Sequence, residues 1–199
     1  MSKEGLTGRN ALVTGASKGL GRAMAVALAK QGAHLILVAR DKEKLEAVAK
    51  EVVEAGSQAD VFAADIAKED QVLQLESDVS AKVGKVQILI NNAGTNLRKN
   101  ITDFTLDEWR GVQDTNVTSV FLMCRSFVPH MKGTGYGRIL NMTSIMAHVS
   151  LPQRTESRVD TRFFGQVQLN INYLTFSKDA VQAGAEDAEA VADSGADEQ

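Results

Sequence analysis

The chain has 199 residues, of which 44% are hydrophobic and 24% charged, and its formal net charge is −3 at pH 7. This length favours a single domain, and no apolar run is long enough to cross a membrane. The start of the chain does not resemble a secretory signal, so we expect a cytoplasmic protein. The single cysteine, Cys124, excludes an internal disulfide, and we expect neither a metal site nor nucleic acid as a partner.

Charge is distributed unevenly along the chain. Residues 179–199 contain seven acids and no base, whereas residues 1–178 carry 22 basic and 18 acidic groups. From Ala183 onward, large apolar side chains are almost absent, so this segment cannot bury enough surface to offset the entropy of ordering it. We therefore predict one folded domain over residues 1–182 and an acidic tail over residues 183–199 that is disordered or at most a frayed helix.

Apolar strand-like runs alternate with helical patterns along the first three quarters of the chain. The predicted strands are Ala11–Thr14, His34–Ala39, Ala59–Ala64, Val86–Asn91 and Arg138–Met142. The predicted helices are Ala23–Gln31, Lys42–Ala55, Lys68–Val83 and Leu106–Met131. Strands that are apolar on both faces need helices on both sides of the sheet. The pattern therefore predicts an α/β fold with a Rossmann-like, doubly wound parallel sheet.

A glycine-rich turn, Thr14–Gly21, joins the first strand to the first helix. Glycine lets the backbone turn tightly and approach a ligand, and the N-terminus of a helix offers free N–H groups to a phosphate. We therefore expect this turn to bind a dinucleotide, although glycine at a strand-to-helix turn can also have a purely steric role. The predicted cofactor-binding residues of the turn are Gly15, Ser17, Lys18, Gly19, Leu20 and Gly21.

The end of the second strand, Val38-Ala39-Arg40, indicates which dinucleotide is bound. NAD enzymes usually place an acid here for the ribose 2′-hydroxyl, whereas this chain has a small residue and then an arginine. The Arg40 guanidinium can pair with a 2′-phosphate, and Lys18 can reach the same group. The two cations together favour NADP(H), and the alternative is that both are solvated surface groups.

Further polar motifs follow the later strands in order. Asp65-Ile66 follows the third strand, Asn91–Gly94 closes the fourth, Asn116 lies in the long helix, and Ser144 follows the fifth strand. With the glycine turn, this set resembles the short-chain dehydrogenase/reductase family, in the branch of the 3-oxoacyl-carrier-protein reductases and gluconate 5-dehydrogenases. The resemblance runs from about Leu6 to Thr155.

The resemblance implies a role for each motif. Asp65 and Ile66 would bind the adenine, and the residues that would line its ribose are Asn92, Ala93 and Gly94. Asn116 would hold a proton-relay water, and Ser144 would hydrogen-bond the substrate carbonyl. Family members transfer a hydride between the nicotinamide and a carbonyl carbon, so the implied substrate is a small carbonyl or alcohol of the 3-oxoacyl, ketone or sugar type. They also pair through the long helix, which implies a homodimer contact over residues 106–131.

The family's Tyr-x-x-x-Lys motif is altered in this chain. In the family, the lysine lowers the tyrosine pKa so that the tyrosine can donate a proton. At the family's spacing from Ser144 stands Ser157, and the best substitute is Tyr173 with Lys178, which are five positions apart instead of four. Residues 156–171 therefore resemble an insertion, and the family's C-terminal strands are not recognisable after Ala183.

The sequence leaves two principal functions open. The first is an NADP(H)-dependent carbonyl reductase, or the reverse alcohol dehydrogenase, with Tyr173 as the acid/base. The second is an inactive NADP(H)-binding remnant, because the Tyr173–Lys178 spacing is altered and the substrate-covering part is missing. A third function is oligomerisation through the long helix.

Overall fold

A computed structural model describes residues 5–97, 99 and 101–144. The predicted insertion over 156–171, the domain boundary at 182, the acidic tail and the expected loss of C-terminal strands lie outside these residues. Within the described ranges, no helix combines the length and the apolar character needed to cross a membrane.

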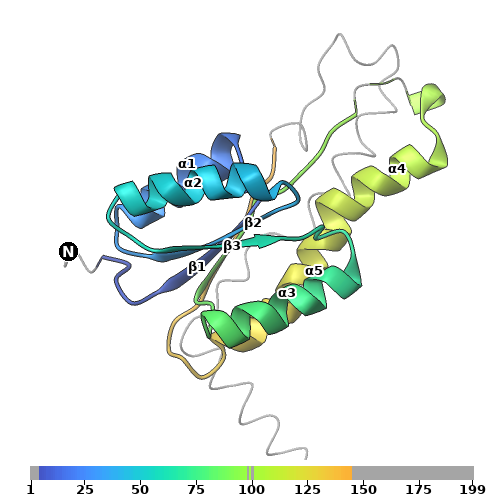
Figure 1. Cartoon of the computed structure of the whole chain (residues 1–199). Helices are drawn as coiled ribbons and strands as arrows, with labels where there is room; N and C mark the ends of the chain where they lie inside the picture. Colours follow the sequence, from blue (N-terminus) through green and yellow to red (C-terminus); the bar gives the residue numbers. More distant parts are fainter. Residues whose placement is uncertain (1–4, 98, 100, 145–199) are drawn as a thin grey trace, which may run out of the picture.

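Five strands form one parallel sheet in the order β3-β2-β1-β4-β5, with helices on both faces (Figure 1). The strands are β1 (Asn10–Thr14), β2 (His34–Ala39), β3 (Ala59–Ala63), β4 (Ile88–Asn91) and β5 (Arg138–Asn141). The helices are α1 (Gly19–Ala29), α2 (Lys42–Glu54), α3 (Glu69–Lys82), α4 (Leu106–Gln113) and α5 (Ser119–Met131), with a 3₁₀ turn η1 (Ile101–Asp103) and a π-helix η2 (Asp114–Thr118). This strand order confirms the predicted Rossmann-like, doubly wound α/β fold.

The predicted elements are present, and their ends agree within two residues except in two of the helices. The helix predicted over Ala23–Gln31 begins earlier, at Gly19, because its first turn is part of the glycine-rich turn, where low helix propensity hides it in the sequence. The helix predicted over Leu106–Met131 is divided into α4, the π-helix η2 and α5. An apolar periodicity cannot reveal such a local widening of the helix.

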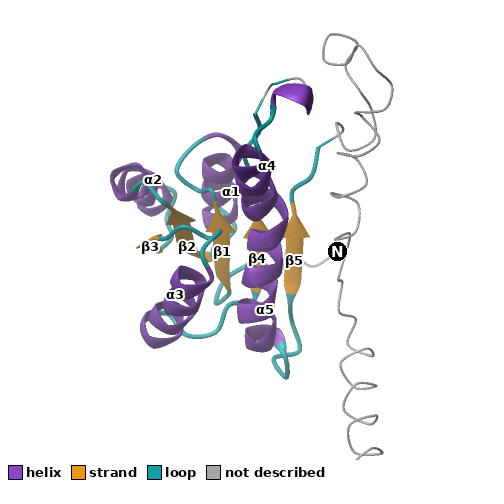
Figure 2. Cartoon of the chain, turned by 90° about the vertical axis from the view of Figure 1, so that its right-hand side faces the viewer, coloured by secondary structure: helices purple, strands orange, loops and turns teal. Residues whose placement is uncertain are grey.

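The two faces of the sheet carry separate hydrophobic cores. On one face, Leu12, Ile36 and Leu89 pack with Phe127 of α5 and Val79 of α3. The opposite face packs against α1 and α2 through the intervening strand residues, among them Val13, Leu37 and Ile90. This alternation is the two-residue repeat of a strand, and it fixes the register of the parallel ladder. Because the five strands run parallel, their carboxyl ends lie at one edge of the sheet (Figure 2).

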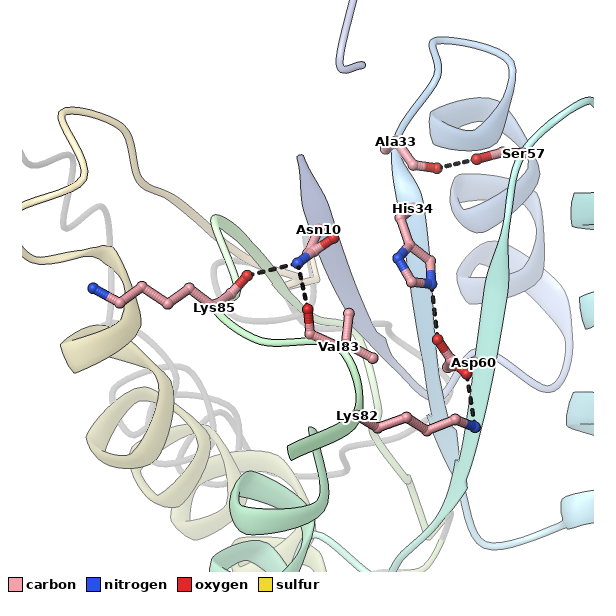
Figure 3. Close-up of polar contacts among 8 residues, drawn as sticks. All are labelled: Asn10, Ala33, His34, Ser57, Asp60, Lys82, Val83 and Lys85. Atoms are coloured by element: carbon pink, nitrogen blue, oxygen red, sulfur yellow. Dashed lines mark hydrogen bonds and ion pairs between the residues drawn. The ribbon is translucent and has the colours of Figure 1, made fainter. Parts of the chain in front are cut away.

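Polar side chains tie the opposite, amino-terminal edge together (Figure 3). Asn10 at the start of β1 donates through Nδ2 to the carbonyl of Lys85, at 2.8 Å. His34 of β2 and Lys82 at the end of α3 each bond one carboxylate oxygen of Asp60 on β3, at 2.8 and 2.7 Å. These contacts connect β1, β2, β3, α3 and the segment before β4.

Candidate functional site

The residues predicted to form the site follow the carboxyl ends of the strands. The glycine turn follows β1, Arg40 follows β2, Asp65 follows β3, and Ser144 follows β5. The segment Asn92–Gly94 follows β4, which pairs directly with β1. In an open parallel sheet, ligands bind outside the carboxyl ends at the point where the strand order reverses, here between β1 and β4. The fold therefore brings these segments to one edge.

Two glycines of the turn permit close packing of backbone on backbone. Gly15 has φ +64°, and a Cβ there would lie 2.9 Å from the Cα of Ala93. A Cβ on Gly21, in the first turn of α1, would collide with the carbonyl oxygen of Gly15 and lie 2.6 Å from Nδ2 of Asn92. The turn, the start of α1 and the segment after β4 are therefore packed as closely as glycine allows.

The third glycine of the turn faces open space. Gly19 begins α1 with φ +57°, and a Cβ there would have no heavy atom within 4 Å. The N-cap residue Lys18 makes no side-chain capping hydrogen bond, so the first N–H groups of α1 are left to an external acceptor. Space beside an uncapped helix N-terminus fits a phosphate group.

Thr14, a residue that the sequence analysis did not select as functional, joins the glycine turn to the segment after β4. Its fully buried side chain accepts hydrogen bonds from the N–H groups of Asn92 and Ala93, at 3.0 and 3.1 Å. The hydroxyl donates to the carbonyl of Ile90 at 3.3 Å. The only sequence signal was a hydroxyl residue at the end of a buried strand.

The Asn92 side chain belongs to the same tie. Its Nδ2 donates to the carbonyl oxygens of Thr14 and Gly15, at 3.0 and 3.4 Å. The Asn92 side-chain amide is therefore already used to hold the glycine turn.

Arg40 and Lys18 are exposed at the edge of the site. The N–H of Ala16 donates to the carbonyl of Val38 at 3.3 Å, so the glycine turn lies against the end of β2 that leads into Arg40. No carboxylate of the described residues forms an ion pair with either cation. Asp41, the residue after Arg40, accepts a hydrogen bond from the N–H of Lys44 and so caps α2. The hydrogen bond from the Lys44 side chain holds the Asp41 pKa below its ordinary value.

Asp65 and Ile66 lie at the end of β3 with different exposure. The half-buried Asp65 carboxylate accepts from the N–H of Ala67 at 3.1 Å, and the Asp65 N–H donates to Oε1 of Gln71 at 2.7 Å. The Ile66 side chain is 8% exposed and belongs to the core. Only the main chain of Ile66 is therefore available to a ligand.

Asn116 lies in the π-helix between α4 and α5. Its side chain forms two hydrogen bonds with the main chain of Thr95, accepting from the N–H and donating to the carbonyl, each at 2.8 Å. A Cβ on Gly94 would lie 3.4 Å from Oδ1 of Asn116. The π-helix therefore positions a side chain that fixes the segment after β4. π-Bulges are frequent at functional sites.

Two further residues that the sequence analysis did not select, Asn91 and Asn141, lie at the ends of β4 and β5. Asn91 is 3% exposed and donates through Nδ2 to Oδ1 of Asn141 at 2.8 Å and to Sγ of Cys124 at 3.6 Å. Burial raises the pKa of the Cys124 thiol, so this cysteine is a packing residue in its neutral form. The amide pair holds the two strands together below the site.

Of the remaining predicted site residues, the structure describes one, Ser144, and not the other two. Ser144 is exposed, three positions beyond the end of β5. Tyr173 and Lys178 lie outside the described residues. Among the residues that are described, no cluster of His, Cys, Asp and Glu could hold a metal ion.

A family model described as short chain dehydrogenase matches residues 9–156. The chain belongs to the short-chain dehydrogenase family. It is 33% identical over 147 residues to a gluconate 5-dehydrogenase of Gluconobacter oxydans, an alignment that covers 74% of this chain and 57% of the relative. It is 36% identical over 145 residues to a 3-oxoacyl-[acyl-carrier-protein] reductase of Staphylococcus epidermidis, covering 72% of this chain and 59% of the relative.

Solved structures of short-chain dehydrogenases share the fold. A metagenomic short-chain oxidoreductase, solved in complex with NADP, superimposes with a TM-score of 0.74 at 29% sequence identity. The match covers 94% of this chain and 76% of that structure. The two curated relatives are longer, and this chain spans less than two thirds of the length of each.

Proposed function

We propose that this short-chain dehydrogenase is an NADP(H)-dependent oxidoreductase that reduces a small carbonyl compound, of the 3-oxoacyl, ketone or sugar type, to an alcohol. The observation that carries the proposal is the uncapped N-terminus of α1 with open space at Gly19, next to the two cations Lys18 and Arg40. The substrate class is proposed by analogy with the gluconate dehydrogenase and oxoacyl reductase relatives.

The cofactor would be held in four parts along the edge. Gly15–Gly21 would bind the pyrophosphate, with Ser17 and Leu20 inside that turn. Arg40 and Lys18 would pair with the 2′-phosphate, because Asp41 is already used by Lys44 and α2. The adenine would contact the segment of Asp65 and Ile66, and the ribose would lie against Asn92, Ala93 and Gly94.

Bound NADPH supplies a hydride to the carbonyl carbon, and the protein then has to supply a proton to the oxygen. Ser144 would donate a hydrogen bond to that oxygen, and the Tyr173 hydroxyl would donate the proton. The Lys178 ammonium would stabilise the tyrosinate that remains. Since both ends of the Asn116 amide bond Thr95, Asn116 would hold a relay water through its main-chain carbonyl.

A second candidate function is an inactive NADP(H)-binding protein. It is favoured by the five-position separation of Tyr173 and Lys178, because five residues of α-helix rotate the chain by about 500° and direct the two side chains roughly 140° apart. Both candidate functions require NADP(H) binding at the carboxyl edge of the sheet, and only the first requires turnover of a substrate.

The cofactor is tested by titrating NADPH and NADH into the protein and following the fluorescence of the reduced nicotinamide. We expect tighter binding of NADPH than of NADH. Arg40→Ala should remove most of this preference, since an arginine–phosphate hydrogen bond is worth about 1.5–3 kcal/mol. Lys50→Ala, an exposed cation on α2, is the matched control and should change nothing. Equal NADPH affinity in Arg40→Ala and the unchanged protein would refute the phosphate assignment.

Turnover is tested by NADPH oxidation with a panel of ketones, keto sugars and 3-oxoacyl thioesters. The chain has two tyrosines, so Tyr173→Phe can be compared directly with Tyr136→Phe. Loss of turnover in the first variant alone supports the reductase. NADPH binding without turnover in the unchanged protein supports the inactive candidate.

We also propose a homodimer through the surface of residues 106–131. Leu106 and Phe121 on this surface are 60% and 55% exposed, more than large apolar side chains usually are. Sedimentation velocity should give a dimer, and Phe121→Asp should shift it to the monomer. A monomer at all concentrations in the unchanged protein would refute this contact.

A further inference from the structure

A cluster of basic residues lies at the amino-terminal edge of the sheet, opposite the proposed cofactor site. Arg9 directly precedes β1, and Arg138 is the first residue of β5. Lys85 lies in the segment before β4, where its carbonyl accepts the side-chain amide of Asn10. Because β4 lies between β1 and β5, these three residues come from adjacent positions along one edge. We call Arg9, Lys85 and Arg138 the basic edge.

Two of these cations share one aromatic ring. The Arg9 guanidinium carbon lies 3.4 Å from the centroid of the Tyr136 ring, and that of Arg138 lies 4.8 Å from it. Stacking on the ring holds the two guanidinium groups in place, but it does not neutralise them. Two like charges held near one ring repel each other, and an anion bound beside them relieves that repulsion.

No carboxylate among the described residues neutralises the basic edge. Its three members form none of the ion pairs found in residues 5–97, 99 and 101–144. The neighbouring cation Lys82 differs, because it pairs with Asp60 at 2.7 Å (Figure 3). The same figure shows the Lys85 side chain directed away from these contacts.

We propose that the acidic C-terminal segment of this same chain, residues 183–199, docks on the basic edge. This segment contains six acids and no base, so its charge complements that of Arg9, Lys85 and Arg138. Contacts between acidic side chains and arginines need no fixed backbone conformation, so the segment binds through charge without forming a core.

The chain is long enough for this contact. The last described residue, Ser144, lies at the carboxyl edge, and the four residues of β5 separate that edge from Arg138 by about 13 Å. The 38 residues from 145 to 182 can span up to about 125 Å when fully extended, far more than this separation. A tether of this length gives an effective concentration of up to about 1 mM, which favours docking within one chain over docking between chains.

Zero-length cross-linking tests the contact directly. A water-soluble carbodiimide joins carboxylates to lysine amines, so Lys85 is the member of the basic edge that reports. We expect amide bonds between Lys85 and acids of residues 183–199 in monomeric protein at about 20 mM salt, identified by peptide mass spectrometry. Lys50 on α2 should give no such product. Salt at 0.5 M, where the screening length falls to about 4 Å, should reduce the yield at least about tenfold.

A double-mutant cycle tests the energetics. One variant replaces the basic edge (Arg9→Gln, Lys85→Gln, Arg138→Gln), another replaces the six tail acids by Asn or Gln, and a third combines both. At low salt each single set should lower the melting temperature, and the combination should lower it by less than the sum of the two. A control set, Lys42→Gln, Lys50→Gln and Arg110→Gln, should show no coupling to the tail.

Two results would overturn the proposal. The first is additive melting-temperature changes at low salt together with no Lys85 cross-link to the tail. The second is a cross-link found only between chains, in covalent dimers whose yield rises with protein concentration, because the occupant is then the tail of a second copy. Neither readout depends on NADPH, so failure here leaves the proposed enzymatic function standing.

Discussion

At the scale of single residues, the Thr14 hydroxyl makes three hydrogen bonds at the proposed site. Thr14→Val keeps the side-chain shape and leaves the N–H groups of Asn92 and Ala93 without their acceptor. Unpaired donors of this kind cost about 1–3 kcal/mol, so we expect a loss of that size in the free energy of unfolding, measured with urea. NADPH affinity should fall as well, because the segment after β4 loses its anchor.

The Thr14→Ser variant separates the hydroxyl from the methyl group. It retains the three hydrogen bonds and loses one buried methyl, worth about 1 kcal/mol. NADPH affinity should therefore remain close to that of the unchanged protein. Wild-type NADPH affinity in Thr14→Val would contradict a positioning role for the hydroxyl.

Two glycines of the turn should respond differently to alanine. At Gly21 alanine would be favoured by about 1 kcal/mol on helix propensity, but its Cβ meets the Gly15 carbonyl, so we expect a lower melting temperature. At Gly19 the space is open, and the positive φ costs about 1–2 kcal/mol. The Gly19→Ala variant should still fold, but it should bind NADPH more weakly, because its methyl group enters the space proposed for the phosphate. A melting temperature of Gly21→Ala equal to or above that of the unchanged protein would contradict this close approach.

At the scale of elements, much of this arrangement was predictable from the sequence. Helix and strand periods located β2 and α2 within one residue, and a parallel sheet necessarily places the segments after Thr14, Ala39 and Asn91 at one edge. The π-helix was not predictable, because one widened turn leaves the apolar pattern of residues 106–131 nearly unchanged. The contacts of Thr14 and Asn116 were also beyond reach, since both partners are distant in sequence.

The contact between α3 and α5 gives the fold an acid-sensitive point. His130 accepts the N–H of Val86 through Nδ1, at 3.2 Å, so its Nε2 carries the proton and donates to Glu76 at 2.7 Å. The pKa of Glu76 lies below its ordinary value of 4.5, first because Ser80 donates to the carboxylate and then because of His130. A carboxyl group whose pKa is lower in the folded state than in the unfolded state stabilises the fold at pH values above its unfolded pKa. This contribution disappears as the pH falls through the folded pKa.

The unfolding free energies of the unchanged protein and Glu76→Gln should therefore differ by a constant amount above about pH 5.5. Their difference should shrink as the pH falls below about 4.5, since Glu76 is then protonated first in the unfolded state and, at lower pH, in the folded state too. Ser80→Ala removes the largest cause and should move this decline to higher pH. Urea titrations from pH 7 to 3.5 measure the effect, and a difference that grows on acidification would contradict it.

At the scale of the whole molecule, the two edges of the sheet carry different tasks. The carboxyl edge is assembled from glycine contacts and main-chain hydrogen bonds that leave N–H groups and cations available to a ligand. The amino edge is held by side-chain pairs such as His34–Asp60–Lys82. Contributions from sites without shared partners are close to additive. Stability lost at one edge should therefore leave ligand binding at the other unchanged.

Thermal shifts test this separation. At about a hundred times its dissociation constant, NADPH should stabilise the folded chain by about 2.7 kcal/mol, which raises the melting temperature by roughly 5–10 °C for a protein of this size. Asp60→Asn removes the ion pair with Lys82 and should lower the melting temperature with and without NADPH, leaving the shift between them intact. Arg40→Ala should do the reverse, keeping the melting temperature of the free protein and reducing the shift. A smaller NADPH shift in Asp60→Asn would mean that the two edges are energetically coupled through β2 and β3, whose parallel ladder connects Asp60 to the end of β2.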